Sequence, residues 1–166
     1  MRDNFFNYST FWYAGTTHNK RHAERMFVKR ALAEHTMIPC SLAMVTSVKQ
    51  ICCIQKIAIA RSFNDFTLIA TDVPNNQFGV FYYGPSQTEQ VFGEGYRCVG
   101  EQTTRLSVVN TGPLGFATSP IDNTEAPHAG QITPGSTWNF QFWYRDPQGG
   151  AAGYNLTDAL QVTFCE

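Results

Sequence analysis

The strongest pattern in the chain is an alternation of two rows of side chains over residues 136–144. One row is Trp138, Phe140, Phe142 and Tyr144, and the other is Thr137, Asn139, Gln141 and Trp143. Successive side chains of a β-strand point to opposite faces, so a period of two is the spacing of a strand. The alternation predicts a strand with one buried face and one more polar face.

Shorter apolar runs, separated by turn residues, fill the rest of the chain after residue 62. The runs that we predict as strands are 66–70, 78–83, 96–99, 104–109, 114–117 and 160–164. Clusters of Gly, Pro and Asn lie between them, without helical periodicity. About seven or eight short strands in this arrangement predict an all-β fold, an antiparallel β-sandwich of the jelly-roll or immunoglobulin-like kind.

Composition changes abruptly near residue 61, which divides the chain into an extension, 1–61, and a β domain, 62–166. The extension holds nine Lys/Arg and three Asp/Glu, whereas the β domain holds three and ten. Residues 21–38 have apolar positions near helical spacing, which predicts one short amphipathic helix, and residues 51–60 fit a strand or a helix. We expect the extension to be helical or poorly structured, and to pack poorly on the β domain.

The charge and hydropathy of the extension bear on its partners. The basic run from Lys20 to Arg30 lacks an aromatic platform or a recognised nucleic-acid module, so we interpret it as a solvated face and expect no nucleic-acid partner. The most apolar stretch, Met37 to Ala60, contains Lys49 and Lys56 and is too interrupted for a membrane-spanning helix. It is also a poor match to a signal peptide.

The five cysteines divide between the two parts. Cys40, Cys52 and Cys53 precede the break and have no zinc-site spacing, which favours buried thiols. Cys98 and Cys165 lie within the β domain, and an even pair there is typical of a disulfide formed in an oxidising compartment.

Residues that carry catalytic or metal chemistry are sparse. No nucleophile elbow, phosphate loop or zincin motif is present, and His128 is the only histidine after the break. A small hydrolase with paired loop carboxylates, either Asp146 with Asp158 or Asp122 with Glu125, is an alternative. Oxygen ligands on loops also make Asp146, Asn155 and Asp158 weak calcium candidates, against a simpler role in turns. We predict no cofactor.

The two tryptophans of residues 136–144 give the sharpest functional hypothesis. Trp138 and Trp143 are an odd number of positions apart, so a regular strand places them on opposite faces. Trp138 belongs to the aromatic row and is expected to be buried, which leaves Trp143 accessible beside Asn139 and Gln141. An indole among amides suits stacking on a sugar ring. The alternative is that a loop or a neighbouring module covers this face.

The order of several sequence blocks resembles a C-terminal β module found at the ends of large secreted proteins of environmental bacteria. The blocks are Phe66–Pro74, Gln77–Pro85, Phe92–Gly100, Gly130–Pro147 and Asn155–Cys165. The resemblance implies an extracellular, non-catalytic module that closes a longer parent protein, with Cys98 and Cys165 matching its two cysteines. It implies no ligand, and it does not extend to residues 1–61.

These observations favour a non-catalytic accessory or terminal module, extracellular or at the cell surface, with an attachment or structural role. The first alternative is a carbohydrate-binding module that uses Trp143, Asn139 and Gln141. Its partner would be a polysaccharide or another cell-surface component. The second alternative is the small hydrolase.

Overall fold

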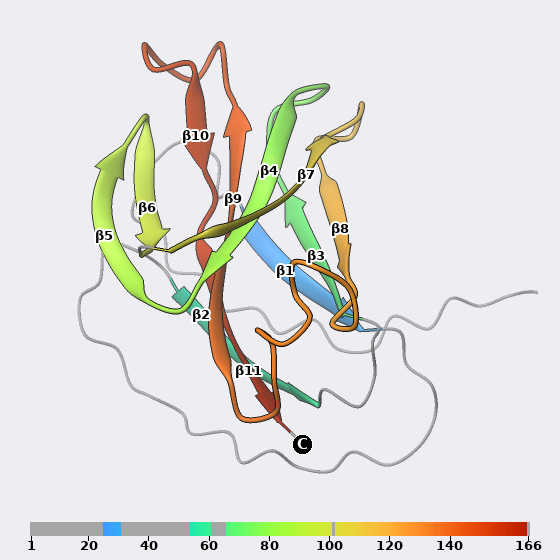
Figure 1. Cartoon of the computed structure of the whole chain (residues 1–166). Coiled ribbons are helices and arrows are strands. Elements are labelled where there is room, and N and C mark those ends of the chain that lie inside the picture. Colours follow the sequence, from blue (N-terminus) through green and yellow to red (C-terminus); the bar gives the residue numbers. More distant parts are fainter. Residues whose placement is uncertain (1–24, 31–53, 61–65, 101, 166) are drawn as a thin grey trace, which may run out of the picture.

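The computed structural model describes residues 25–30, 54–60, 66–100 and 102–165 (Figure 1). These residues form strands and loops without a helix. The strands are β1 (Arg25–Arg30), β2 (Ile54–Ala60), β3 (Phe66–Thr71), β4 (Phe78–Gly84), β5 (Gln87–Phe92), β6 (Gly95–Val99), β7 (Thr104–Asn110), β8 (Ala117–Ile121), β9 (Thr137–Arg145), β10 (Tyr154–Leu156) and β11 (Ala159–Cys165).

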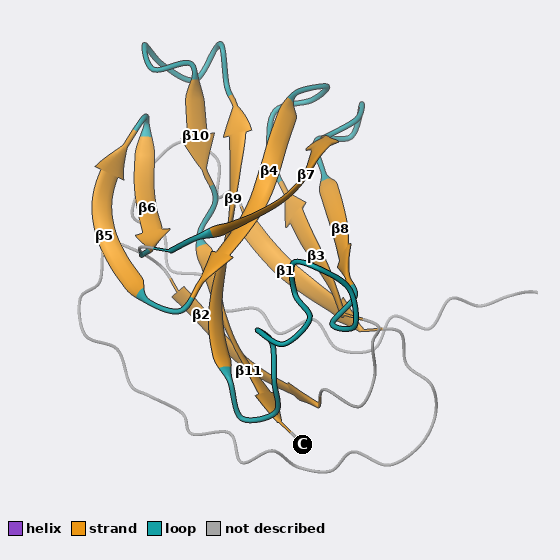
Figure 2. Ribbon diagram, viewed as in Figure 1, coloured by secondary structure: helices purple, strands orange, loops and turns teal. Residues whose placement is uncertain are grey.

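The strands form two larger sheets and one hairpin (Figure 2). The smaller sheet has the order β1-β3-β8, and the larger has the order β2-β11-β9-β4-β7, with β10 also paired to β9. The hairpin consists of β5 and β6. The pairing is antiparallel except between β2 and β11. The predicted all-β, largely antiparallel architecture is confirmed.

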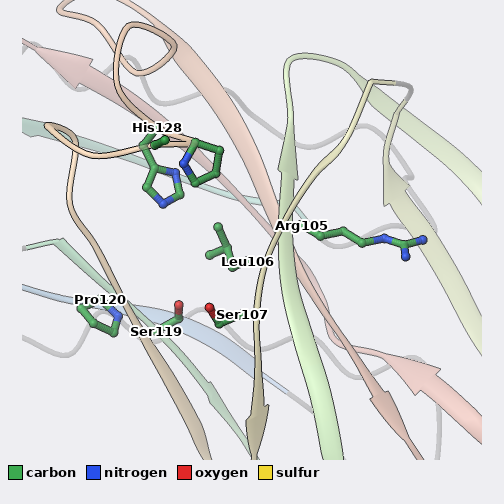
Figure 3. A pocket seen from close by; sticks show the side chains of 8 residues that line it. Arg105, Leu106, Ser107, Ser119, Pro120 and His128 are labelled. Atoms are coloured by element: carbon green, nitrogen blue, oxygen red, sulfur yellow. The ribbon is translucent and has the colours of Figure 1, made fainter.

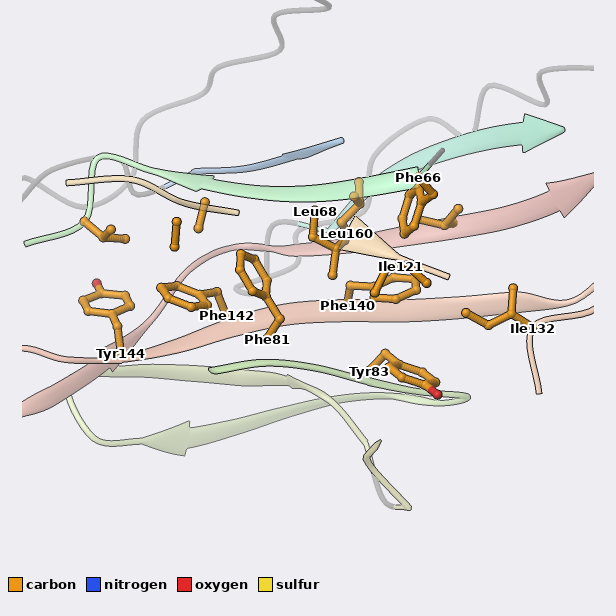
Figure 4. Packing of buried hydrophobic residues seen from close by; sticks show 14 of the residues in the cluster. Phe66, Leu68, Phe81, Tyr83, Ile121, Ile132, Phe140, Phe142, Tyr144 and Leu160 are labelled. Atoms are coloured by element: carbon orange, nitrogen blue, oxygen red, sulfur yellow. The ribbon is translucent and has the colours of Figure 1, made fainter. Parts of the chain in front are cut away.

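The main core lies between the two larger sheets (Figure 4). Alternate residues of β3 are buried, and they face the aromatic row of β9. Phe66 contacts Phe140 and Phe164 with ring centroids 5.6 Å apart in both pairs. The predicted buried row of residues 136–144 is thus confirmed at Phe140, Phe142 and Tyr144, which are all fully buried.

The β5–β6 hairpin covers part of the opposite face of the larger sheet, which we call the outer face. A second buried cluster forms there from Tyr82, Cys98, Val99, Leu156 and Ala159. Trp143 and Tyr96 pack against this cluster. The fold therefore has three layers in this region, with β9 and β4 in the middle layer.

Two strands of the extension pair within the sheets, which corrects the expectation that residues 1–61 pack poorly. β1 pairs with β3 from Arg25 opposite Thr71 to Arg30 opposite Phe66. β2 runs parallel to β11 from Ile54 beside Ala159 to Ala60 beside Cys165. The helix predicted over 21–38 is wrong across β1, and the rest of that prediction lies outside the described residues. The open edges of β3 and β11 explain the difference, because their backbone groups require partners that a side-chain pattern does not reveal.

Candidate functional site

The two tryptophans of β9 lie on opposite faces, as the alternation predicted. Trp138 packs against the main core, and Trp143 packs against the cluster under the hairpin. Both side chains are only partly buried. The predicted contrast between a buried Trp138 and an open Trp143 is therefore smaller than expected, because the hairpin covers part of the outer face.

Gln141 is buried and holds the hairpin in place, which corrects its prediction as a ligand-binding residue. Its side-chain oxygen accepts hydrogen bonds from the Tyr82 hydroxyl at 2.5 Å and from the Cys98 backbone N–H at 2.9 Å. Its side-chain nitrogen donates to the Tyr96 carbonyl at 2.8 Å and the Thr157 carbonyl at 2.7 Å. Both oxygen lone pairs and both N–H groups are thus used within the protein.

Asn139 is also buried, with 1 % of its surface exposed, and its side chain hydrogen-bonds within the protein. Its oxygen accepts from the side-chain nitrogens of Gln87 at 2.9 Å and Gln161 at 3.2 Å. Its nitrogen donates to the Gly84 carbonyl at 3.3 Å. Asn139 and Gln141 therefore bond the hairpin and neighbouring strands instead of forming the open polar surface that the sequence predicted.

An unpredicted feature of the outer face is a row of three aromatic side chains, Trp143, Tyr154 and Phe92, which we call the aromatic row of the outer face. Ring centroids lie 5.7 Å apart between Trp143 and Tyr154, and 5.4 Å apart between Tyr154 and Phe92. Phe92 is 40 % exposed, and the other two rings are half-buried. The three residues come from β9, β10 and β5, so alternation within one strand could not reveal the row.

Aliphatic and charged side chains extend the surface beside the aromatic row. Val80 of β4 pairs with Trp143 on one side and with Val108 of β7 on the other, and Val108 is 68 % exposed. Arg145 pairs with Tyr154 and is exposed. This end of the outer face combines aromatic, aliphatic and cationic groups.

The calcium candidates lie apart along β9, which corrects their assignment to one site. The Asp146 N–H donates to the Gly153 carbonyl, whereas the Thr157 N–H, next to Asp158, donates to the Phe142 carbonyl. Asp146 is four residue steps beyond Phe142, a distance of about 13 Å along an extended chain. Asn155 pairs with Tyr144, between these points, and its oxygen accepts from the Leu156 N–H at 2.8 Å. Within the described residues, no group of three or more His, Cys, Asp or Glu is placed to hold a metal ion.

The two carboxylate pairs considered for a hydrolase lie in different surroundings. The backbone anchors of Asp146 and of Thr157, next to Asp158, lie about 13 Å apart along β9. Asp122 organises a turn, because its side-chain oxygen accepts from the Thr124 N–H at 2.8 Å and hydroxyl at 2.6 Å. The Glu125 N–H donates to the Asp122 carbonyl in the same turn.

The register of β9 and β11 argues against the predicted Cys98–Cys165 bridge. Cys98 is disulfide-bonded, and its N–H places it over β9 at Gln141. Thr163 of β11 lies opposite Thr137, and Cys165 continues two residues further from Gln141. Six residues of extended chain span about 20 Å, whereas the Cα atoms of a disulfide lie within about 7 Å. The side chain of Cys165 lies outside the described side chains.

A cavity of about 330 Å³ opens between β7, β8 and the loop that carries His128 (Figure 3). The His128 Nδ1 lies 3.2 Å from the Tyr83 hydroxyl, which donates to the Gln131 side-chain oxygen at 3.0 Å. Burial lowers the pKa of His128, with a smaller opposing effect from Asp122. His128 is therefore a packed and hydrogen-bonded side chain.

Comparison with protein-family models, curated proteins and solved structures finds no match. Within the part of the chain that the structure describes, no helix is long and apolar enough to cross a membrane.

Proposed function

We propose that this protein is a non-catalytic attachment module, extracellular or at the cell surface, that binds a polysaccharide through the aromatic row of the outer face. The module is part of a longer parent protein. Trp143, which the sequence predicted, shares this surface with Tyr154 and Phe92, whereas Asn139 and Gln141 are buried.

The single observation that carries the proposal is the contact of Trp143, Tyr154 and Phe92 in one partly exposed row. Aromatic rings offer flat apolar surfaces to the C–H faces of sugar rings. The two centroid spacings follow one another across β9, β10 and β5, which suits an extended polymer better than a single small molecule. Arg145 beside Tyr154 supplies hydrogen-bond donors for sugar hydroxyls or carboxylates.

The rigidity of the row also supports a binding role. Trp143 is supported from below by the buried cluster under the hairpin. Tyr154 is backed by the backbone bond between the Glu94 N–H and its own carbonyl, at 3.4 Å. A surface that is already ordered loses little conformational entropy when it binds.

The extracellular location is supported by the disulfide at Cys98, since disulfides persist in oxidising compartments. The resemblance of residues 66–165 to terminal modules of secreted proteins agrees with this location.

The proposal is tested by co-sedimentation of the full chain with a panel of insoluble polysaccharides. We expect at least one polymer to retain the wild-type protein, and Tyr154→Ala and Phe92→Ala to weaken retention at least tenfold. Leu114→Ala is the matched control, because Leu114 is 78 % exposed on a loop away from the row. Failure of every polymer to retain the wild type, or equal retention of all variants, would reject the proposed contact surface.

A further inference from the structure

We infer that the cavity between β7 and β8 is a separate binding site for one neutral, hydroxyl-rich small molecule the size of a single sugar ring or cyclic polyol. It is lined on one side by Ser107 and Ser119 and on the other by His128 (Figure 3). The site lies at the seam between the two larger sheets. It shares no residue with the aromatic row of the outer face.

The strongest indication is the position of Ser119. This residue lies on the core-facing side of β8, between the buried Ala117 and Ile121, and opposite Leu68 of β3. It is 7 % exposed, and its hydroxyl lines the cavity beside that of Ser107. A hydroxyl on the core-facing side of a strand needs a hydrogen-bond partner, and a molecule bound in the cavity can supply one.

Several neighbouring side chains line the same cavity. Figure 3 shows the hydroxyl oxygens of Ser119 and Ser107 side by side, both directed into the cavity, with Leu106 between them and the His128 ring. Leu106 gives the cavity an apolar wall. It also packs against the main core, which holds this wall in place. Two hydroxyls and one apolar wall match the mixed surface of a sugar or polyol.

The hydrogen-bond network assigns the role of His128. The Tyr83 hydroxyl has one proton, which it donates to Gln131, so it must accept from the Nδ1–H of His128. The Nε2 atom of the neutral ring is then a hydrogen-bond acceptor. Burial lowers the pKa of His128, so the neutral ring is the prevalent form at neutral pH.

The charge of the lining selects a neutral ligand. Arg105 is the only lining side chain that is always charged, and Figure 3 shows its guanidinium directed away from the cavity. A carboxylate or phosphate ligand would thus enter without a cationic partner, at a desolvation cost. The volume is at the lower end of the range for ligand sites, which favours one ring over an oligosaccharide.

The experiment is a titration of the ¹⁵N-labelled full chain with glucose, galactose, xylose and myo-inositol, followed by amide chemical shifts. We expect saturable shifts at Ser107, Ser119 and His128 with at least one of these probes, and little response to inorganic phosphate or acetate. Ser119→Val should weaken binding at least tenfold, because it removes the hydroxyl and fills the space. Thr118→Val is the matched control, since Thr118 neighbours Ser119 but is exposed on the opposite face of β8.

Ser107→Val provides a second test that does not depend on a core position, because Ser107 is exposed. The inference is overturned if no neutral probe gives saturable shifts, if phosphate or acetate binds more tightly than they do, or if Ser119→Val and Ser107→Val both bind like the wild type. Tyr154→Ala should retain binding of the small probe. Loss of polysaccharide retention by Tyr154→Ala tests the proposed function, whereas loss of probe binding by Ser119→Val tests the cavity site.

Discussion

The side-chain oxygen of Gln141 accepts the backbone N–H of Cys98 at 2.9 Å, across the gap between β9 and the hairpin. The same amide also bonds Tyr82, Tyr96 and Thr157, so one side chain connects β4, β6 and the link between β10 and β11 to β9. The hairpin therefore depends on a residue that, on sequence alone, resembles a surface amide.

Gln141→Leu should destabilise the protein by about 3 kcal/mol, because it leaves several buried polar groups without partners. Chemical denaturation of the wild type and variant measures this loss. Gln90→Ala, at an exposed position on β5, is the control and should change stability little. Hydrogen exchange at the Cys98 amide should also accelerate in Gln141→Leu, and unchanged exchange would show that the hairpin is held by other contacts.

The cysteine that bonds Cys98 can be identified by tryptic mapping without reduction. Ala159 belongs to the same buried cluster as Cys98, and the register sets Ile54 beside Ala159. Cys52 and Cys53 directly precede Ile54 in sequence, whereas Cys165 lies at the opposite end of β11. We therefore expect Cys98 to bond Cys52 or Cys53. The expected product joins peptide 98–105 to peptide 50–56. A product that joins 98–105 to 146–166 would contradict the observed register and restore the sequence prediction, and one with 31–49 would identify Cys40.

His128 should make the protein less stable in mild acid. Burial lowers the pKa of the folded-state ring, with a smaller opposing effect from Asp122, while the unfolded ring titrates near 6.5. The unfolded state therefore binds more protons just below that pH, so stability is fully present above about 6.5 and is lost as pH falls toward the folded-state pKa. Thermal unfolding between pH 8 and about pH 5 should show this loss.

His128→Gln provides the comparison for this pH dependence, because the variant keeps His18, His22 and His35. Its unfolding temperature should fall less steeply with acid than that of the wild type. Parallel pH profiles for the two proteins would contradict the role of His128.

Gly79 is expected to be intolerant of any side chain. A Cβ atom there would meet the ring of Phe142 and lie 2.7 Å from the Trp143 carbonyl oxygen. Gly79→Ala should thus destabilise by about 2 kcal/mol, as overpacking of a core typically does. Thr118→Ala, on an exposed strand position, is the control in the same denaturation experiment, and equal midpoints would show that Phe142 moves aside at little cost.

The alternation of β9 was enough to predict a strand, its buried aromatic face and the placement of Trp138 and Trp143 on opposite sides. This worked because side-chain direction in a strand is a local property of the backbone. The turn residues between apolar runs were likewise enough to predict the all-β class, since Gly, Pro and Asn act on the backbone where they stand.

What covers each face of the sheet depends on how distant segments pack together. Asn139 and Gln141 occupy polar positions in the alternation, yet the β5–β6 hairpin buries them, and its approach depends on contacts between distant segments. The pairing of β1 and β2 at the sheet edges was not visible for the same reason, because it uses backbone groups that every sequence carries. The aromatic row of the outer face and the cavity between β7 and β8 also bring together residues from separate strands. Their positions depend on the register and packing of the whole chain, which a local pattern does not encode.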